Sequence, residues 1–120
     1  MKVIIDLIED IRESIGNAEA YVLRAGLLKE DPSDASRLIY AGEAAIGSFV
    51  LDAVHKELLF HIGTDKALTI GALIPELLIL DMHAMMYTLK IDVNAQYRGM
   101  EVVGFAKSDE ERSYTLFIKL

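Results

Sequence analysis

Three histidines are the side chains best suited to acid–base or metal chemistry in this 120-residue sequence, because only imidazole titrates near neutral pH without help from its surroundings. They are His55, His61 and His83. Two acids, Asp52 and Asp81, lie in segments that the predicted elements bring toward these histidines. We therefore take a set of four residues as a candidate ligand or metal site: His61, Asp52, His83 and Asp81.

A predicted hairpin positions half of this site. Residues 48–54 and 57–62 alternate apolar and polar side chains, which predicts two strands that share one core face. The residues on that face are Phe49, Leu51, Ala53, Leu58, Phe60 and Ile62. With 55–56 as the turn, His61 lies diagonally across from Asp52 on the other face. An ordinary surface contact between these two residues is the competing interpretation, and the spacing favours it.

The sequence contains no standard catalytic or nucleotide-binding motif. The patterns GxxxxGK[ST], GxGxxG, HExxH and GxSxG and the EF-hand loop are all absent. This argues against P-loop nucleotide hydrolysis, zincin proteolysis and serine hydrolysis of the α/β type. We predict no catalytic residue and no cofactor, and the sequence leans toward a protein that is not an enzyme.

Charge and composition limit the partners. The net charge is −7, from 19 acidic and 12 basic residues spread along the chain, so the sequence predicts no nucleic-acid partner. The longest nearly uncharged run, 68–80, contains Glu76 and is shorter than the roughly 20 apolar residues needed to span a bilayer. The absence of cysteine excludes disulfides and thiolate metal sites and predicts a cytoplasmic location.

Hydrophobic content is high for so small a domain. It reaches 52%, with a mean hydropathy of +0.30. Because subunit interfaces of homodimers are more apolar than ordinary surface, this surplus predicts a homo-oligomer, most simply a dimer. An unusually dense core is the alternative.

The N-terminal segment has the most regular helical periodicity. Apolar residues recur at alternating steps of four and three from Ile4 to Ala25, which predicts a long helix within 1–31 that ends before Pro32. A glycine at 16 weakens it by about 1 kcal/mol relative to alanine. We expect the apolar stripe to be a coiled-coil-like interface with a partner. Its residues are Ile4, Ile8, Ile11, Ile15, Ala18 and Val22.

The rest of the chain predicts strands on either side of a second helix. Residues 36–63 predict a strand followed by the hairpin, and residues 69–81 predict a helix with Thr69 as its N-cap. Residues 86–120 predict three antiparallel strands. No internal sequence repeat is evident, although both halves follow a helix-then-strands plan.

The predicted fold is a single α+β domain with a long N-terminal helix, a β-hairpin, a second shorter helix and a C-terminal three-stranded antiparallel meander. The leading functional expectation is a non-enzymatic, homo-oligomeric protein–protein interaction module. The alternative is a small-ligand- or metal-binding protein, or a minor enzyme, with a pocket between the sheet and the second helix. A third reading is an acidic antagonist of nucleic-acid-binding proteins.

Overall fold

A computed structural model describes residues 1–14, 19–63, 66–93 and 99–120 of the chain. This part contains two α-helices, one 3₁₀ turn and six strands. In chain order they are α1 (Ile4–Ser14), β1 (Val22–Asp31), β2 (Asp34–Asp52), β3 (Glu57–Ile62), α2 (Ile70–Leu78), η1 (Ala84–Met86), β4 (Thr88–Asp92), β5 (Met100–Ser108) and β6 (Ser113–Lys119).

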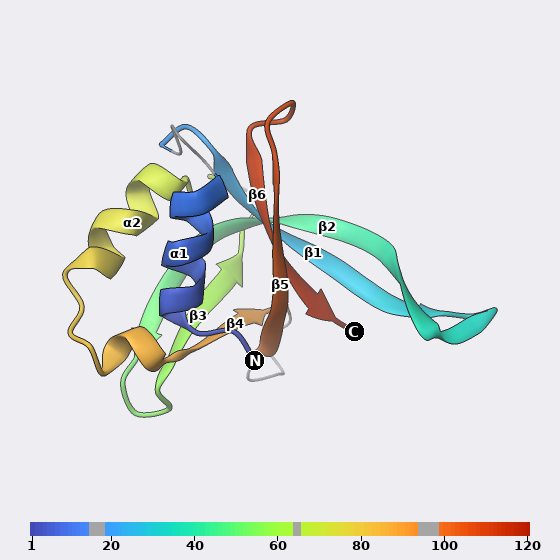
Figure 1. Cartoon of the computed structure of the whole chain (residues 1–120), viewed down its shortest axis with the longest axis horizontal. Helices are drawn as coiled ribbons and strands as arrows, with labels where there is room; N and C mark the ends of the chain where they lie inside the picture. The colour runs from blue at the N-terminus through green and yellow to red at the C-terminus, as the bar shows by residue number, and fades with distance from the viewer. Residues whose placement is uncertain (15–18, 64–65, 94–98) are drawn as a thin grey trace.

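The six strands close into a barrel in their sequence order (Figure 1). Adjacent strands are antiparallel within the set β1, β2 and β3, and also within the set β4, β5 and β6. The two sets join through two parallel pairs, β3 with β4 and β6 with β1. In a closed barrel each strand has a hydrogen-bonded neighbour on both sides, so closure needs no further strand.

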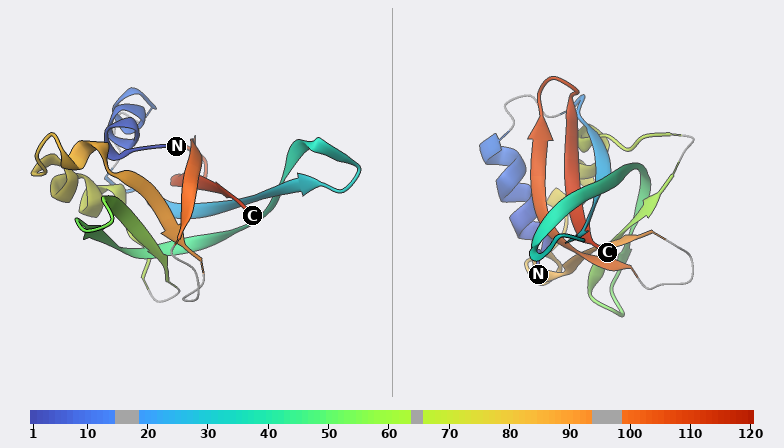
Figure 2. Two further views of the ribbon diagram at one scale, coloured as in Figure 1. Left: turned by 90° about the horizontal axis from the view of Figure 1, so that it is seen from below. Right: turned by 90° about the vertical axis from the view of Figure 1, so that its right-hand side faces the viewer.

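Both helices lie on one side of the barrel, and the far end of the β1–β2 hairpin projects from the opposite side (Figures 1 and 2). The apolar faces of the helices and the inward-facing residues of the strands form one buried core. Its largest fully buried members include Ile4, Leu7, Leu23, Leu58, Phe60, Ile70, Leu73, Leu77, Leu89, Ile91 and Tyr114. Neither helix of the described chain is long and apolar enough to cross a bilayer.

The predicted architecture is wrong in two respects. The N-terminal helix is short, and the three C-terminal strands are one half of a six-stranded mixed barrel rather than a separate meander. The predicted helical stripe ran too far because Val22 and Ala25, its last members, belong to strand β1, in which Leu23 and Ala25 face the core. Pro32 lies in the β1–β2 turn instead of ending a helix. The strand predicted before the hairpin and most of the first predicted hairpin strand, 48–54, belong to one 19-residue strand, β2.

The two halves of the barrel are structural repeats. Each half consists of a helix followed by three antiparallel strands, and each helix starts beside the first strand of the other half. The N–H of Ile4 donates to the carbonyl of Tyr87 (3.1 Å), and the N–H of Ile70 donates to the carbonyl of Tyr21 (2.9 Å). The two donors are 66 residues apart in the sequence, and the two acceptors are also 66 residues apart. At this shift the matching residues are Ile4 and Ile70, Leu7 and Leu73, Ile8 and Ile74, Ile11 and Leu77, Tyr21 and Tyr87, and Leu23 and Leu89.

The correspondence continues through the last two strands of each half, at a shift of 56 residues. The β2–β3 turn closes with Asp52 opposite Glu57, and the β5–β6 turn closes with Ser108 opposite Ser113. Both hairpins have an irregularity at the same place, between Ile46 and Ser48 and between Val102 and Gly104. The expectation of no internal repeat is therefore corrected: the repeat is present, but a ten-residue change of spacing interrupts it.

This change of spacing falls in the β1–β2 hairpin. Residues 29–42 of the first half stand where the second half has only residues 95–98. β6 pairs with β1 only as far as Leu28, and β3 pairs with β2 only from Ile46 onward. Residues 29–42, which we call the arm, thus form a two-stranded ribbon outside the barrel (Figure 1).

A side-chain hydrogen bond joins α1 to β6. The hydroxyl of Tyr114, whose side chain is fully buried, donates to the carboxylate of Asp10. Burial, and then this bond, raise the pKa of Tyr114 well above its ordinary value. A tyrosine whose pKa is higher when folded stabilises the protein below its unfolded pKa of about 10, and this contribution is lost as the pH rises above that value.

We predict that Tyr114→Phe lowers the free energy of unfolding by about 1–3 kcal/mol at pH 7, because the bond to the carboxylate is lost. The difference from the unmodified protein should shrink as the pH rises from 9 through 11. Urea unfolding at a series of pH values measures it. A difference that stays constant over this range would contradict the account of Tyr114.

Candidate functional site

The four residues predicted as a site do not meet. The β2–β3 turn contains residues 53–56 rather than 55–56 alone, so Asp52 lies opposite Glu57 and His61 lies opposite Ser48. Asp52 and His61 still share the outer face, because a register shift of two residues preserves the alternation of faces. They are about four residues apart along the hairpin, or roughly 13 Å. Two residues of the predicted core face, Leu51 and Ala53, are exposed, and Ala53 lies in the turn.

Each of the other predicted residues has a local role. His61 contacts Asp92 on β4, with 3.6 Å between Nδ1 and Oδ2. Asp81 accepts a hydrogen bond from the N–H of Ala84 (2.9 Å) at the start of η1. His83 borders a hollow of about 410 Å³ together with Lys56, Met86 and Tyr87.

Among the residues predicted as a subunit interface, those that the structure describes on α1 lie in the core rather than on the surface. Ile4, Ile8 and Ile11 are buried in the core of their own chain. Val22 is the first residue of β1 and bridges to Thr69. Ile15 and Ala18 are outside the described residues. The regular stripe of α1 therefore packs within the chain.

The β2–β3 turn gathers a different set of polar groups. Asp52, His55 and Glu57 each place one ligand atom within 4.8 Å of the other two. The Oδ2 of Asp52 is 2.6 Å from Nδ1 of His55, while its Oδ1 accepts from the N–H groups of Val54 and His55, each at 3.0 Å. The backbone N–H of His55, followed by its imidazole, lowers the pKa of Asp52, so this carboxylate is ionised at neutral pH.

Glu57 is the buried member of this cluster. Its side chain is only 8% exposed, and its Oε2 lies 2.7 Å from Nζ of Lys90 on the neighbouring strand β4. Burial of a carboxylate without a counter-charge is unfavourable, so Lys90 is the group that permits it. The cluster thus combines two carboxylates and one imidazole with a single cation beside them.

The repeat provides an internal comparison for this turn. The second half has Ser108, Glu111 and Ser113 at the positions of Asp52, His55 and Glu57. The backbone is alike: the N–H of Glu111 donates to Oγ of Ser108, and Arg112 has a φ of 49° where Lys56 has 55°. The turn therefore forms without a metal-binding residue set, and the imidazole and carboxylates of the first half are additional to what the backbone needs.

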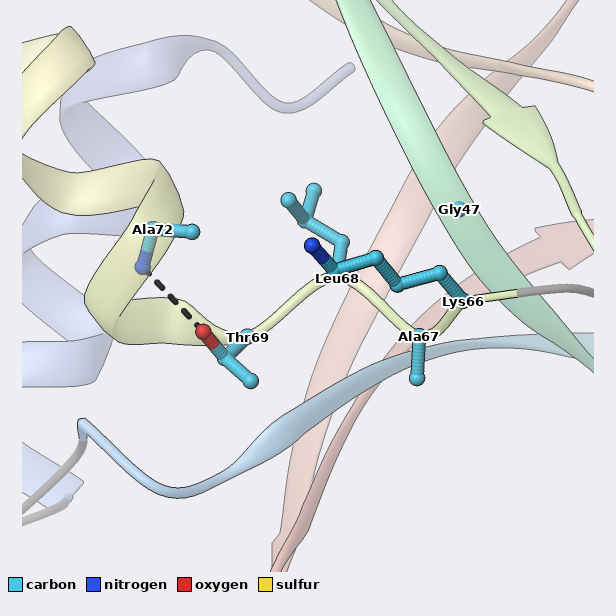
Figure 3. Close-up of a pocket in the computed structure, with 6 residues that line it drawn as sticks. All are labelled: Gly47, Lys66, Ala67, Leu68, Thr69 and Ala72. Carbon is cyan, nitrogen blue, oxygen red and sulfur yellow. Dashed lines mark hydrogen bonds between the residues drawn. The ribbon is translucent and has the colours of Figure 1, made fainter.

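A second hollow, of about 320 Å³, lies between β2 and the start of α2, where a pocket was expected (Figure 3). None of the four predicted residues borders it. Its lining is Gly47, Lys66, Ala67, Leu68, Thr69 and Ala72. The first N–H groups of α2 donate to the chain itself, from Ile70 to Tyr21 and from Ala72 to Oγ1 of Thr69, so they offer no anion site.

The arm exposes apolar side chains. Leu38 and Tyr40 on β2 are 43% and 52% exposed, and both lie on one face of the ribbon with Leu28. The Tyr40 ring meets Phe117 of β6 edge-on at 6.3 Å, and its hydroxyl donates to Glu43 (3.0 Å). These contacts fix the base of the arm on the outside of the barrel and leave its outer part without a covering element.

Reasoning from the sequence missed both the arm and His55. The spacing Asp52-x-x-His55 was a usable signal, because a carboxylate can reach a side chain three residues on across a tight turn. The repeated Tyr-x-Leu at 21–23 and 87–89 was another. Aligning the two halves on this motif shows that the first hairpin of the first half is longer than its counterpart in the second half.

The ion pair of Glu57 gives a stability prediction. Lys90→Met should lower the free energy of unfolding by about 3 kcal/mol, because it leaves the Glu57 carboxylate buried without its partner. Adding Glu57→Ser, the residue found at the equivalent position 113, should restore most of this loss. Chemical denaturation of the two variants tests the pair; a double variant no more stable than Lys90→Met would refute the assignment.

Comparison with protein-family models, with curated proteins and with solved structures finds no match for this chain. The sites available for a functional argument are therefore those of the molecule itself: the turn cluster of Asp52, His55 and Glu57, and the arm.

Proposed function

We propose that this protein is a small, non-enzymatic protein–protein interaction module that forms a homodimer through its arm, and that it works in the cytoplasm. The observation that carries the proposal is the arm itself, fourteen residues where the other repeat has four. Barrel closure does not require it, since the second half closes with the shorter connection. The lack of cysteine supports the location.

A two-stranded ribbon is marginally stable in water when it has no sheet or helix against it. The arm has neither beyond its base, and it exposes Leu38 and Tyr40. Covering its apolar face with a second arm would remove this surface from water, at about 25 cal/mol per Å² of apolar area. Self-association therefore gives the ribbon the packing that the barrel does not provide.

The accessible surface of the chain is larger than that of a compact monomer of the same mass. Its accessible surface is 7246 Å². A compact monomer of 13.3 kDa is expected to expose about 6,450 Å². The excess of about 800 Å² expresses a shape that is less compact than average, to which the projecting arm contributes.

Charge is compatible with contact between two arms. The net charge of the chain is −7, but the arm carries two cations, Lys29 and Arg37, and three anions, Glu30, Asp31 and Asp34. Two arms of nearly balanced charge meet with little repulsion, whereas the rest of the acidic surface keeps other parts of the two copies apart.

The proposal is tested by exchanging the arm for the short connection of the other repeat. Residues 29–42 are replaced by Ala-Gln-Tyr-Arg, the sequence at 95–98. Sedimentation equilibrium should show a dimer for the full chain and a monomer for the exchanged variant, whose circular dichroism should retain the strand signal. A full chain that is monomeric at high micromolar concentration would refute the proposal.

A matched pair of substitutions tests the apolar face of the arm. Leu38→Ser should weaken the dimer at least tenfold, because an interfacial leucine contributes about 1.5–3 kcal/mol. Leu78→Ser is the control, since Leu78 is 55% exposed at the end of α2, away from the arm. Equal weakening by both variants would show that the arm face is not the contact surface.

Metal binding at the β2–β3 turn is a second candidate function. It is favoured by the convergence of Asp52, His55 and Glu57 within 4.8 Å, because two carboxylates and an imidazole suit Zn²⁺ and related divalent ions. Calorimetric titration of the full chain with Zn²⁺ or Ni²⁺ should show one site. Replacing the three residues with their counterparts, Asp52→Ser, His55→Glu and Glu57→Ser, should abolish it.

The control for this titration is His61→Ala, which removes a histidine of similar exposure on the same face of the hairpin. Binding should be unchanged by His61→Ala. No heat of binding in the unmodified chain, or an equal loss with His61→Ala, would eliminate the turn as a metal site.

A further inference from the structure

We infer that β2 of the arm pairs edge to edge with β2 of a second copy, so that a β-sheet runs continuously across the dimer. The inference rests on the proposed function and is narrower than it. Two copies could associate by burying the apolar faces of their arms without any strand pairing. The structure assigns the contact between the copies to the backbone edge of β2.

The outer edge of β2 is unpaired along the whole arm. Between Asp34 and Gly42 the strand pairs with β1 on one side, with irregularities at 35–37 and at 41, and its pairing with β3 on the other side begins only at Ile46. Over Leu38–Tyr40, where pairing with β1 is regular, alternate residues direct their N–H and C=O groups outward, and such an edge is the surface that β-strand addition uses.

The other edge of the ribbon is short and partly covered. β1 is free only over Lys29–Asp31, because the N–H of Leu120 donates to the carbonyl of Leu28 (2.7 Å) at the point where β6 ends. The side chain of Lys119 also reaches Glu30, with 3.4 Å from Nζ to Oε1. A partner strand therefore has far more room along β2 than along β1.

Apart from the irregularities at 35–37 and 41, the β2 edge has few of the devices by which proteins protect open strands. Such edges usually carry lysines, prolines or inward-pointing charges that prevent pairing with another chain. Between Ala35 and Ala41 the strand has a single charged residue, Arg37, and it contains the run Leu38-Ile39-Tyr40, which has high β-propensity. Arg37 makes no ion pair with any described residue. An unprotected edge of this kind is stable in solution when it is paired.

A second copy fits this edge better than an unrelated strand. Two β2 edges related by a two-fold axis run antiparallel, and each supplies the same donors and acceptors to the other in an isologous contact. The arm also has nearly balanced charge, with two cations and three anions in a chain of net charge −7, so two arms meet with little repulsion. Both observations point to this chain as its own partner.

Single cysteines test the inference, because the protein has none of its own. In an antiparallel pair around a two-fold axis, one position faces itself at a Cα separation of about 5 Å, within the range of a disulfide. Positions two residues away are separated by more than about 12 Å. Cysteine is placed, one variant at a time, at Ala35, Ser36, Arg37, Leu38, Ile39, Tyr40 and Ala41, and controls are made at Lys29 and Met82.

Mild oxidation at a concentration where the dimer is populated, followed by non-reducing electrophoresis, measures the covalent dimer. We expect one position or two adjacent positions on β2 to cross-link at least about tenfold faster than their neighbours two residues away. Met82, which is 87% exposed beyond the end of α2, and Lys29 on the β1 edge should cross-link no faster than those neighbours.

The failures are distinguishable. A dimer by sedimentation with fastest cross-linking at Lys29 or Met82, or with the same rate at every β2 position, would overturn the edge pairing while leaving self-association standing. A monomer by sedimentation would overturn both this inference and the proposed function.

Discussion

Closure of the barrel depends on the way each half completes the other. Three antiparallel strands leave two open edges, and the two halves cover these edges with the parallel pairs β3–β4 and β6–β1. The same relation fixes the helices, since Ile4 and Ile70 begin them on carbonyl groups of the opposite half. Neither half could bury its core residues alone, because the helix of each half packs into the cluster that the strands of both halves form.

The repeat also separates what the fold requires from what it does not. Where the two halves agree, as in the bulges near Ile46 and Val102 or the left-handed residues Lys56 and Arg112, geometry explains the residue or the conformation. Where the two halves differ, the fold does not by itself require the residues that are found. The arm and the turn residues Asp52, His55 and Glu57 are the main differences, and they are the two places for which we propose a function.

Much of the local structure could be predicted from the sequence. Thr69 caps α2, the core face of the β2–β3 hairpin contains Leu58 and Phe60, and the last three strands lie close to their predicted ranges. The closed topology could not be predicted, because periodicity shows which face of an element is buried but not which element covers it. The segment Val22–Ala25 shows the difficulty: its apolar residues fit a helical stripe and a strand equally well, and only pairing with β6 decides.

The candidate site failed for a related reason. The faces of Asp52 and His61 were right, but their separation depended on the length of a turn, and a turn of 53–56 instead of 55–56 moved them apart. The same longer turn brought His55 onto Asp52. A hairpin pattern without a strong turn signal therefore predicts faces well and distances poorly.

The central claim is that the outer edge of β2 is paired with a second copy, and hydrogen–deuterium exchange along the arm tests it most directly. In a ribbon, alternate N–H groups of β2 point away from β1 and are open to solvent. If the account is right, these amides within 34–44 are protected at concentrations where the dimer is populated and lose protection on dilution, while the amides that face β1 change less. Exchange of the outward amides that is fast and independent of concentration would contradict it.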